Sequence, residues 1–310
     1  MSAATHPRGW WARTLDSDLA LNFLGSPGAV VAAVVTALLV ASAATAAWIS
    51  PHHPLDLASL DLLNAELPPA WLPGGSWSFA LGTDNQGRDV LSAILYGLRT
   101  SLLVGFASIA FAMLIGVSLG LAAGFMRGWI DSVIMRIADI QLTFPAILIA
   151  LLISGVARTA LPQSRSGMLA LAVLILSIGL ANWVQYARII RALTMVESEK
   201  DYVLAARTIG QTPVFIAVRH ILPNALGPVT VVATINLALA ILTEATLSFL
   251  GAGTPPTEPS LGSLVRAGNE FMFAGSWWIV VFPSLTLVIL ILAVNVLGDW
   301  LRDALNPRLR

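Results

Sequence analysis

Few side chains in this sequence have the types and spacing that catalysis requires. The chain contains no cysteine, which excludes thiol catalysis, disulfides, thiolate zinc sites and iron–sulfur clusters. Ser92, Ser101 and Ser108 have no histidine near them in the sequence, and no H-E-x-x-H pattern occurs. The only lysine, Lys200, follows Glu199, so the chain has no G-x-x-x-x-G-K-[ST] phosphate-binding loop. These observations predict neither an enzyme active site nor ATP hydrolysis by this chain.

The histidines raise the question of a metal site. His52 and His53 are followed by Asp56, and imidazole and carboxylate groups are metal ligands. Two adjacent histidines beside Pro51 and Pro54 are, however, typical of a solvated turn. The turn is the favoured interpretation, and no metal site is predicted.

Several polar residues lie within apolar segments, where a charge costs about 2.5–3.5 kcal/mol on insertion scales. Glu244 is the deepest. It could line a pore or relay protons. Alternatively, it could have a structural role, with its carboxylate hydrogen-bonded to a neighbouring helix or lying near the outer mouth. A lone acid makes a poor relay, which favours the structural role. Asn182 and Asn236 could line a pathway, although hydrogen bonds between helices are the commoner role. Arg136 and Asp139 are predicted to pair with each other, because they lie three residues apart on one helical face.

A polar segment between two apolar runs contains the other residues of interest. Asp201 is predicted to cap a short helix by accepting backbone N–H bonds, and Gly210 is predicted to end it. The small pair Ala205-Ala206 would let this helix approach another surface closely. The segment is therefore predicted to be a short, exposed, rigid helix that meets a cytosolic surface. An ordinary surface helix is the alternative.

The elements that position these residues are long and apolar. Hydrophobic residues make up 57% of the chain and charged residues only 11%, against roughly a quarter charged in a soluble domain. A helix needs about 20 apolar residues to cross the hydrocarbon core of a membrane. Six runs approach or exceed that length, at residues 29–49, 102–125, 137–156, 168–186, 229–250 and 277–297. The sequence therefore predicts an all-α membrane protein with six transmembrane helices.

The seventeen basic residues are distributed unequally between the two sides that six spans define. With the N-terminus in the cytosol, twelve of them lie on the cytosolic side and five lie outside. Because positive charge favours the cytosolic side, both termini are predicted to be cytosolic. The outer residues are Arg88, Arg99, Arg158, Arg165 and Arg266.

This topology divides the chain into five regions. The tail at 1–28 contains Trp10 and Trp11 beside Arg13, which predict an interfacial elbow helix. The other regions are a first span at 29–49, an extracytoplasmic loop at 50–100, a core of five spans at 101–298 with a cytosolic loop at 189–228, and a cytosolic tail at 299–310.

The cytosolic loop resembles a known motif. Ala205-Ala206, Gly210 and Leu222-Pro223 stand at the spacing of the EAA loop of ATP-binding-cassette (ABC) importer permeases. That resemblance implies a coupling helix that docks on a cytosolic ATPase subunit. Leu204 departs from the pattern, because an acidic residue usually precedes the two alanines, so a contact to the ATPase would be apolar here. The implied coupling residues are Asp201, Tyr202, Leu204, Ala205, Ala206, Arg207, Gly210, Leu222 and Pro223.

Further segments resemble the C-type permeases of dipeptide and oligopeptide importers. The segments are L-G-T-D-N-Q-G-R-D-V-L-S at 81–92, Y-G-L-R at 96–99, R-H-I-L-P-N-A at 219–225, E-A-T-L-S-F-L-G at 244–251 and the tail from 298 onward. The resemblance covers almost the whole chain. It implies a type I ABC importer permease core in a bacterial cytoplasmic membrane, with half of the translocation path for di- or oligopeptides in this chain.

The same resemblance implies an assembly. Two cytosolic ABC ATPase domains would bind ATP and Mg²⁺, a second and different permease would complete the pore, and an extracytoplasmic binding protein would deliver peptides. This chain would itself bind no cofactor and no nucleic acid. The open alternatives are an ABC permease for nickel, glutathione or another small solute, an ion-coupled secondary transporter, and a membrane scaffold. A secondary transporter is disfavoured because neither internal repeats nor clusters of intramembrane charge are evident.

Overall fold

The chain folds into helices that run between two polar ends. The computed structural model describes residues 22–54, 61–160, 167–255 and 258–304. Their only β pairing is the isolated bridge between Thr83 and Asp89, so the predicted all-α class is confirmed. The longer helices are α3 (Pro27–Ala44), α5 (Val90–Met126), α6 (Gly128–Leu142), α7 (Ala146–Ala160), α8 (Gly167–Glu197), α11 (Leu222–Phe249) and α13 (Trp278–Ala304). The shorter ones are α4 (Ala46–Ile49), α9 (Asp201–Thr208), α10 (Pro213–Ile216) and α12 (Leu261–Asn269).

The membrane-crossing helices match five of the six predicted spans directly. In the described ranges, α3, α5, α8, the helix that continues from α10 into α11, and α13 are each long and apolar enough to cross a membrane. The third predicted span, at 137–156, is not one straight helix, because α6 and α7 meet at an angle of 94°. Pro145 at the break explains the bend, since the residue before a proline is pushed out of helical geometry. Counting the bent pair as one span brings the number to six.

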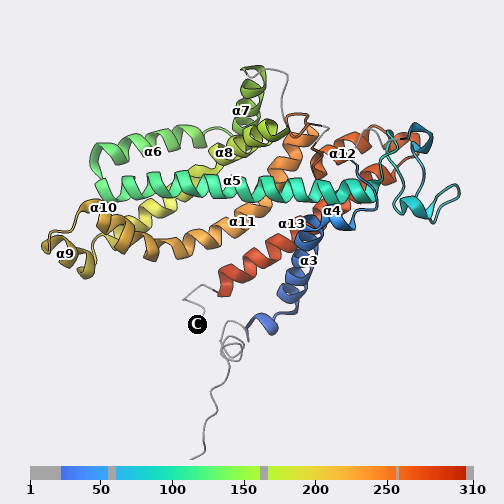
Figure 1. The fold of residues 1–310 in the computed structure, drawn as a ribbon. Coiled ribbons are helices and arrows are strands. Elements are labelled where there is room, and N and C mark those ends of the chain that lie inside the picture. Colours follow the sequence, from blue (N-terminus) through green and yellow to red (C-terminus); the bar gives the residue numbers. More distant parts are fainter. Residues whose placement is uncertain (1–21, 55–60, 161–166, 256–257, 305–310) are drawn as a thin grey trace, which may run out of the picture.

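Helix α5 begins at Val90, within the stretch that was predicted to be loop. Asp89 caps it, because its carboxylate accepts a hydrogen bond from the backbone N–H of Ser92 at 3.0 Å. With 37 residues at 1.5 Å each, α5 is about 55 Å long, which exceeds the hydrocarbon thickness. It therefore connects the polar segments at both ends of the molecule, as Figure 1 shows.

The close packing of α5 against α8 depends on three glycines. Gly116, Gly120 and Gly124 lie one helical turn apart on α5, and a Cβ atom on any of them would meet α8 atoms at 2.7 Å or less. The nearest of those atoms are the backbone oxygens of Trp183, Ala187 and Arg191. Such contacts are the usual way in which membrane helices approach closely.

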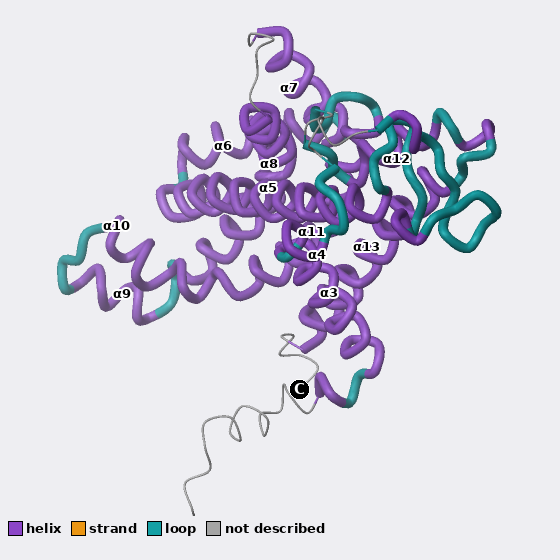
Figure 2. Tube along the Cα trace, turned by 45° about the vertical axis from the view of Figure 1, so that its right-hand side comes forward, coloured by secondary structure: helices purple, strands orange, loops and turns teal. Residues whose placement is uncertain are grey.

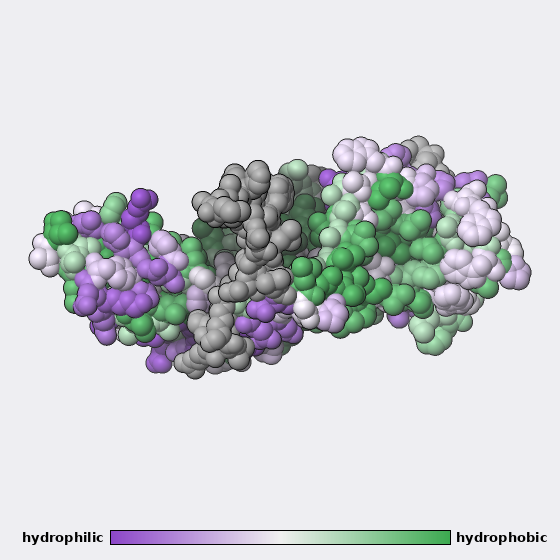
Figure 3. All heavy atoms as spheres, turned by 90° about the horizontal axis from the view of Figure 1, so that it is seen from below, coloured by the Kyte–Doolittle hydropathy of each residue, from purple (hydrophilic) through white to green (hydrophobic). Residues whose placement is uncertain are grey.

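The two ends of the molecule differ from the middle. In Figure 1, α9 and α10 lie at one end of α5, and α12 lies at the other end. The loop-rich segments gather around α12 in Figure 2. Figure 3 shows hydrophobic side chains gathered between the hydrophilic α9 end and a paler opposite end. This pattern is what a chain that crosses a bilayer should present.

The charged residues between α6 and α8 pair differently from the prediction. Asp139 accepts a hydrogen bond from Arg188 on α8 at 2.5 Å, so the expected pair with Arg136 is wrong. Asp131 likewise binds Arg191 through two bonds of 2.5 and 2.7 Å. Packing of α6 along α8 brings these opposite charges together, which spacing within one helix could not reveal. The predicted elbow helix and the last residues of the tail lie mainly outside the described ranges.

Candidate functional site

The polar segment between α8 and α11 is built around the short helix α9. Its N-cap residue is Lys200, and no side chain accepts a capping bond there. The prediction that Asp201 caps the helix is therefore wrong, because Asp201 is already the first helical residue. In that position its carboxylate still lies in the first turn, where negative charge favours the helix dipole.

The C-terminal end of α9 confirms the predicted stop at Gly210. Gly210 has a φ of +82°, in the left-handed region that glycine adopts without cost. Its N–H bonds to the carbonyl of Arg207 at 3.0 Å, and the N–H of Gln211 bonds to the carbonyl of Ala206 at 3.2 Å. This pair of bonds is the Schellman arrangement, which satisfies the last carbonyl groups of the helix.

The two faces of α9 have different surroundings. Val203 and Ala206 are buried and cluster with Ile216 and Ile221. Leu121 and Phe125 of α5 pack against that cluster, and the guanidinium of Arg207 lies 5.5 Å from the centre of the Phe125 ring. On the opposite face Asp201, Leu204, Ala205 and Thr208 are exposed, with 48% of Leu204 accessible. Of the two alanines, only Ala205 is thus available to a partner surface.

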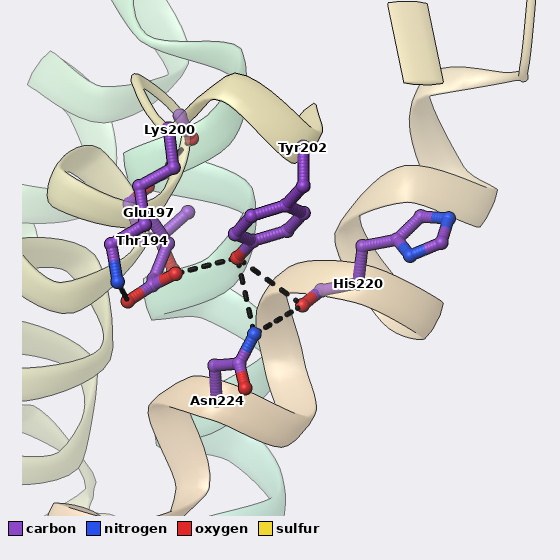
Figure 4. A network of polar contacts seen from close by, with 7 residues as sticks. Thr194, Glu197, Lys200, Tyr202, His220 and Asn224 are labelled. Carbon is purple, nitrogen blue, oxygen red and sulfur yellow. Dashed lines mark hydrogen bonds and ion pairs between the residues drawn. The ribbon is translucent and has the colours of Figure 1, made fainter. Parts of the chain in front are cut away.

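The phenol of Tyr202 joins three segments through hydrogen bonds (Figure 4). Its hydroxyl donates to Glu197 at the end of α8 at 2.5 Å and accepts from the amide of Asn224 on α11 at 3.1 Å. Glu197 also accepts a bond of 2.6 Å from Lys200, and Asn224 donates to the carbonyl of His220 at 3.0 Å. The network therefore holds α9 between the end of α8 and the start of α11.

The protonation states suit this network. Burial raises the pKa of the Tyr202 phenol, and the hydrogen bond to the Glu197 carboxylate raises it further. The pKa of Lys200 is also raised, first of all by its hydrogen bond to Glu197. At neutral pH both groups keep their protons, so each can donate to the carboxylate.

The residues Leu222 and Pro223 mark the return of the chain toward the membrane. Between α10 and α11 the helix passes through a π-helical turn at Ala217–Ile221. In a regular α-helix the ring of Pro223 would clash with the carbonyl of Arg219, and the wider turn lies just before it. Leu222 packs against the main hydrophobic core, while Pro223 is exposed. Helices α10 and α11 are thus joined through this turn into one continuous helix, Pro213–Phe249.

Some residues of this site could not be selected from the sequence. Glu197 and Asn224 complete the Tyr202 network. Asn224 lies in the R-H-I-L-P-N-A segment but was not among the implied coupling residues, and no motif marks Glu197. The ring of His220 also contributes to this segment, because its Nε2 atom lies 2.9 Å from the side-chain oxygen of Gln211. The only sequence signal for Glu197 was its position as a polar residue beside an apolar run. Many surface residues share that feature, so it does not select a site.

The residues considered for a translocation path all bond within the chain. Glu244 is fully buried and accepts bonds from Ser101 at 2.8 Å and Ser248 at 2.6 Å. Asn236 donates to Gln185 at 2.9 Å, and Asn182 donates to a carbonyl of its own helix at 2.8 Å. Their part in translocation stays a prediction.

The paired histidines bond separately. The Nδ1 atom of His52 lies 3.6 Å from a carboxylate oxygen of Asp89, and Nδ1 of His53 lies 3.4 Å from the hydroxyl of Tyr96. Asp56 falls outside the described residues. Within the ranges that the structure describes, no three His, Asp or Glu side chains are grouped to hold a metal ion.

Known proteins resemble this chain over most of its length. Residues 116–310 match the family described as "Binding-protein-dependent transport system inner membrane component". The di/tripeptide transport system permease protein DppC of Pseudomonas aeruginosa (strain UCBPP-PA14) is 36% identical over 93% of this chain and 91% of its own length. The dipeptide transport system permease protein DppC of Escherichia coli (strain K12) is 39% identical over 93% of this chain and 91% of its own length. The glutathione transport system permease protein GsiD of Pectobacterium atrosepticum is 36% identical over 100% of this chain and 93% of its own length.

The fold has a match among solved structures. A chain of the MetNI methionine ABC transporter, in an inward-facing conformation, aligns with a TM-score of 0.52 over 69% of this chain and 96% of that one, at 20% identity. This likeness supports the membrane permease fold. Together, the family match and the relatives show that this chain belongs to the binding-protein-dependent transport system inner membrane components, the multi-pass permease subunits of ABC importers.

Proposed function

We propose that this chain forms half of the translocation path of an ATP-driven importer of short peptides, and that α9 couples it to a cytosolic ATPase. One observation carries the coupling role: α9 is fastened to α8 and α11 on one side while Leu204 and Ala205 are exposed on the other. A helix held in this way moves with the membrane helices when a partner pushes it. Leu204 makes the proposed contact apolar, where a carboxylate is usual.

The proposed cargo follows from the relatives. Their names specify di/tripeptides, dipeptides and glutathione, which is itself a small peptide. We therefore favour short peptides over nickel or another small solute. The ABC class also argues against an ion-coupled secondary transporter and against a scaffold.

The proposed assembly supplies what this chain lacks. Because the sequence has no phosphate-binding loop, ATP and Mg²⁺ would bind to two ATPase domains on other polypeptides. A second, different permease would complete the pore, and an extracytoplasmic binding protein would deliver the peptide. The excess of arginine on the α9 side supports cytosolic termini in a bacterial cytoplasmic membrane.

A pair of substitutions at Ala205 tests the coupling role. Ala205→Arg places a long charged side chain on the exposed face of α9, and Ala205→Ser keeps the residue small. The complete transporter, reconstituted with its binding protein, is assayed for ATP hydrolysis stimulated by a mixed dipeptide pool. We expect Ala205→Arg to lose most of the stimulation or the ATPase itself, with Ala205→Ser close to wild type.

Equal stimulation in wild type and Ala205→Arg would refute the coupling role. Uptake of radiolabelled dipeptide by the same proteoliposomes tests the cargo separately. A wild-type transporter that hydrolyses ATP with its binding protein but takes up no dipeptide would refute the peptide assignment and leave coupling intact.

A further inference from the structure

A pocket of about 690 Å³ lies at the end of the molecule opposite α9. Its wall includes α12, the outer ends of α8 and α11, and the turn at residues 85–88. Its volume falls within the range of roughly 300–1,000 Å³ that is usual for small-ligand sites. Apolar residues, including Leu264 and Phe271, share the wall with charged and amide side chains.

Two opposite charges face this pocket from α12 and its C-cap. Arg266 and Glu270 both line it, both are exposed, and neither makes an ion pair or side-chain hydrogen bond in the part of the chain that the structure describes. Arg88, by contrast, is neutralised within the wall by Asp84 at 2.7 Å. A guanidinium and a carboxylate in the same pocket are thus available to a ligand of complementary charge.

The helix that positions this pair is fixed on several sides. Ser260 and Ser263 form a reciprocal capping box at its start, and the N–H of Leu261 bonds to Ser101 of α5 at 3.1 Å. A Cβ on Gly262 would lie 2.4 Å from the carbonyl oxygen of Ala245, so α12 packs directly on the backbone of α11. The charges therefore lie on a rigid support, which reduces the entropy lost when a ligand binds.

Gly251 positions the guanidinium in particular. A Cβ atom there would lie 2.1 Å from Nη1 of Arg266, so the side chain rests against the glycine backbone. Its φ of +84° also lies in the region that glycine favours. The end of α11 thus packs directly against the Arg266 guanidinium.

We propose that this pocket binds a short zwitterionic peptide through its two charged ends. The terminal carboxylate binds Arg266, and the terminal ammonium group binds Glu270. Residues four apart on a helix have Cβ atoms about 5–6 Å apart, and the terminal nitrogen and carboxyl carbon of a dipeptide are about 6 Å apart. Recognition of the termini leaves the peptide side chains free, so the site accepts many sequences. This inference rests on the proposed peptide cargo.

Direct binding without the binding protein tests the site. The full permease and ATPase complex in nanodiscs is titrated with L-alanyl-L-alanine, and binding is followed by saturation-transfer NMR. We expect Arg266→Gln and Glu270→Gln each to weaken binding about tenfold, the effect of losing one charge-assisted hydrogen bond. Arg99→Gln is the matched control, because Arg99 is an exposed arginine on the outer part of α5 that does not line the pocket.

Modified dipeptides assign each end of the ligand. Wild type should bind the C-terminal amide about tenfold more weakly than the free dipeptide, and Arg266→Gln should bind the two equally. Wild type should likewise bind the N-acetylated dipeptide about tenfold more weakly than the free dipeptide, and Glu270→Gln should bind these two equally. Glu270→Gln should still bind the C-terminal amide more weakly than the free dipeptide. An unfolded variant would lose this selectivity as well.

Several results would overturn the site. Unchanged affinity in both variants would do so, as would no detectable binding of the dipeptide to wild type. A loss of stimulation by the binding protein in Arg266→Gln with unchanged dipeptide affinity would assign the pocket to a protein contact instead. Peptide uptake by the wild-type transporter alongside any of these results would leave the proposed function standing, whereas absent uptake would reject that function itself.

Discussion

The hydroxyl of Ser101 on α5 donates a 2.8 Å hydrogen bond to the carboxylate of Glu244 on α11, and both residues are fully buried. The same hydroxyl accepts a bond from the N–H of Leu261, at the start of α12. Ser248 donates to the other carboxylate oxygen, and its hydroxyl lies 3.1 Å from that of Ser260. The acid therefore joins α5, α11 and α12 next to the pocket that Ser248 also lines.

Removal of the bond between Ser101 and Glu244 should destabilise the end of the protein that contains α12. We expect Ser101→Ala to cost about 1–3 kcal/mol, because it leaves a buried carboxylate oxygen with one donor fewer. The measurement is the apparent melting temperature of the purified complex. Ser118→Ala is the control, since Ser118 is exposed and bonds only within its own helix. Equal melting temperatures for the two variants would contradict a stabilising role for the Glu244 cluster.

Loss of the Tyr202 hydroxyl should loosen α9. Tyr202→Phe removes bonds to Glu197 and Asn224 and should cost about 1 kcal/mol, because the site is partly exposed to water. Amide hydrogen exchange within α9 should then be roughly fivefold faster. Tyr96→Phe, whose hydroxyl makes only a 3.4 Å contact, serves as the control. If exchange in α9 is the same in both variants, the network does not hold the helix.

The backbone at Gly210 should limit which residues it accepts. Nothing lies within 4 Å of a Cβ at this position, so any effect comes from the φ of +82° rather than from collision. Gly210→Val should cost about 1–2 kcal/mol, and Gly210→Asn should cost less, because asparagine tolerates left-handed geometry. Hydrogen exchange of the last turn of α9 measures the difference. Equal exchange in the two variants would show that this turn does not keep its conformation.

The glycines of α5 should tolerate no large side chain. At Gly120 a Cβ would lie 2.4 Å from the carbonyl oxygen of Ala187, so Gly120→Leu must separate α5 from α8. We expect a large fall in the yield of assembled complex. Gly155→Leu is the control, because that glycine of α7 has no atom within 4 Å of its Cβ position. Comparable yields from both variants would show that the close approach is dispensable.

The orientation of the chain can be measured with single cysteines, because the natural sequence has none. Leu63 in the outer segment is 90% exposed, and Asp303 near the end of α13 is exposed. A membrane-impermeant maleimide should label Leu63→Cys in intact spheroplasts. Asp303→Cys should react only after permeabilisation. The reverse pattern would invert the proposed topology.

Much of the fold was predictable from local sequence. The apolar runs located five spans, and Gly210 ended α9 as expected, because run length and left-handed backbone geometry are properties of neighbouring residues. The apolar run at 137–156 was also predicted to be a span, but the sharp bend at Pro145 was not predicted. A proline can kink a span or divide it, and the 94° angle depends on what the two halves pack against.

Contacts between distant segments needed the tertiary structure. Asp139 pairs with Arg188 rather than with Arg136, since an adjacent helix offers a better-placed cation. Likewise, Tyr202 finds Glu197 and Asn224 only when α8, α9 and α11 meet.

Hydropathy and local motifs lie along the chain, so they were enough to identify an all-α membrane permease. The exposed face of α9, the partners of the Glu244 carboxylate and the shared pocket of Arg266 and Glu270 became known only from the packed helices. The physical reason is that hydrogen bonds and pockets depend on distances between helices. Those distances follow from packing, such as the contact of Gly120 with Ala187, and not from the order of residues in one helix.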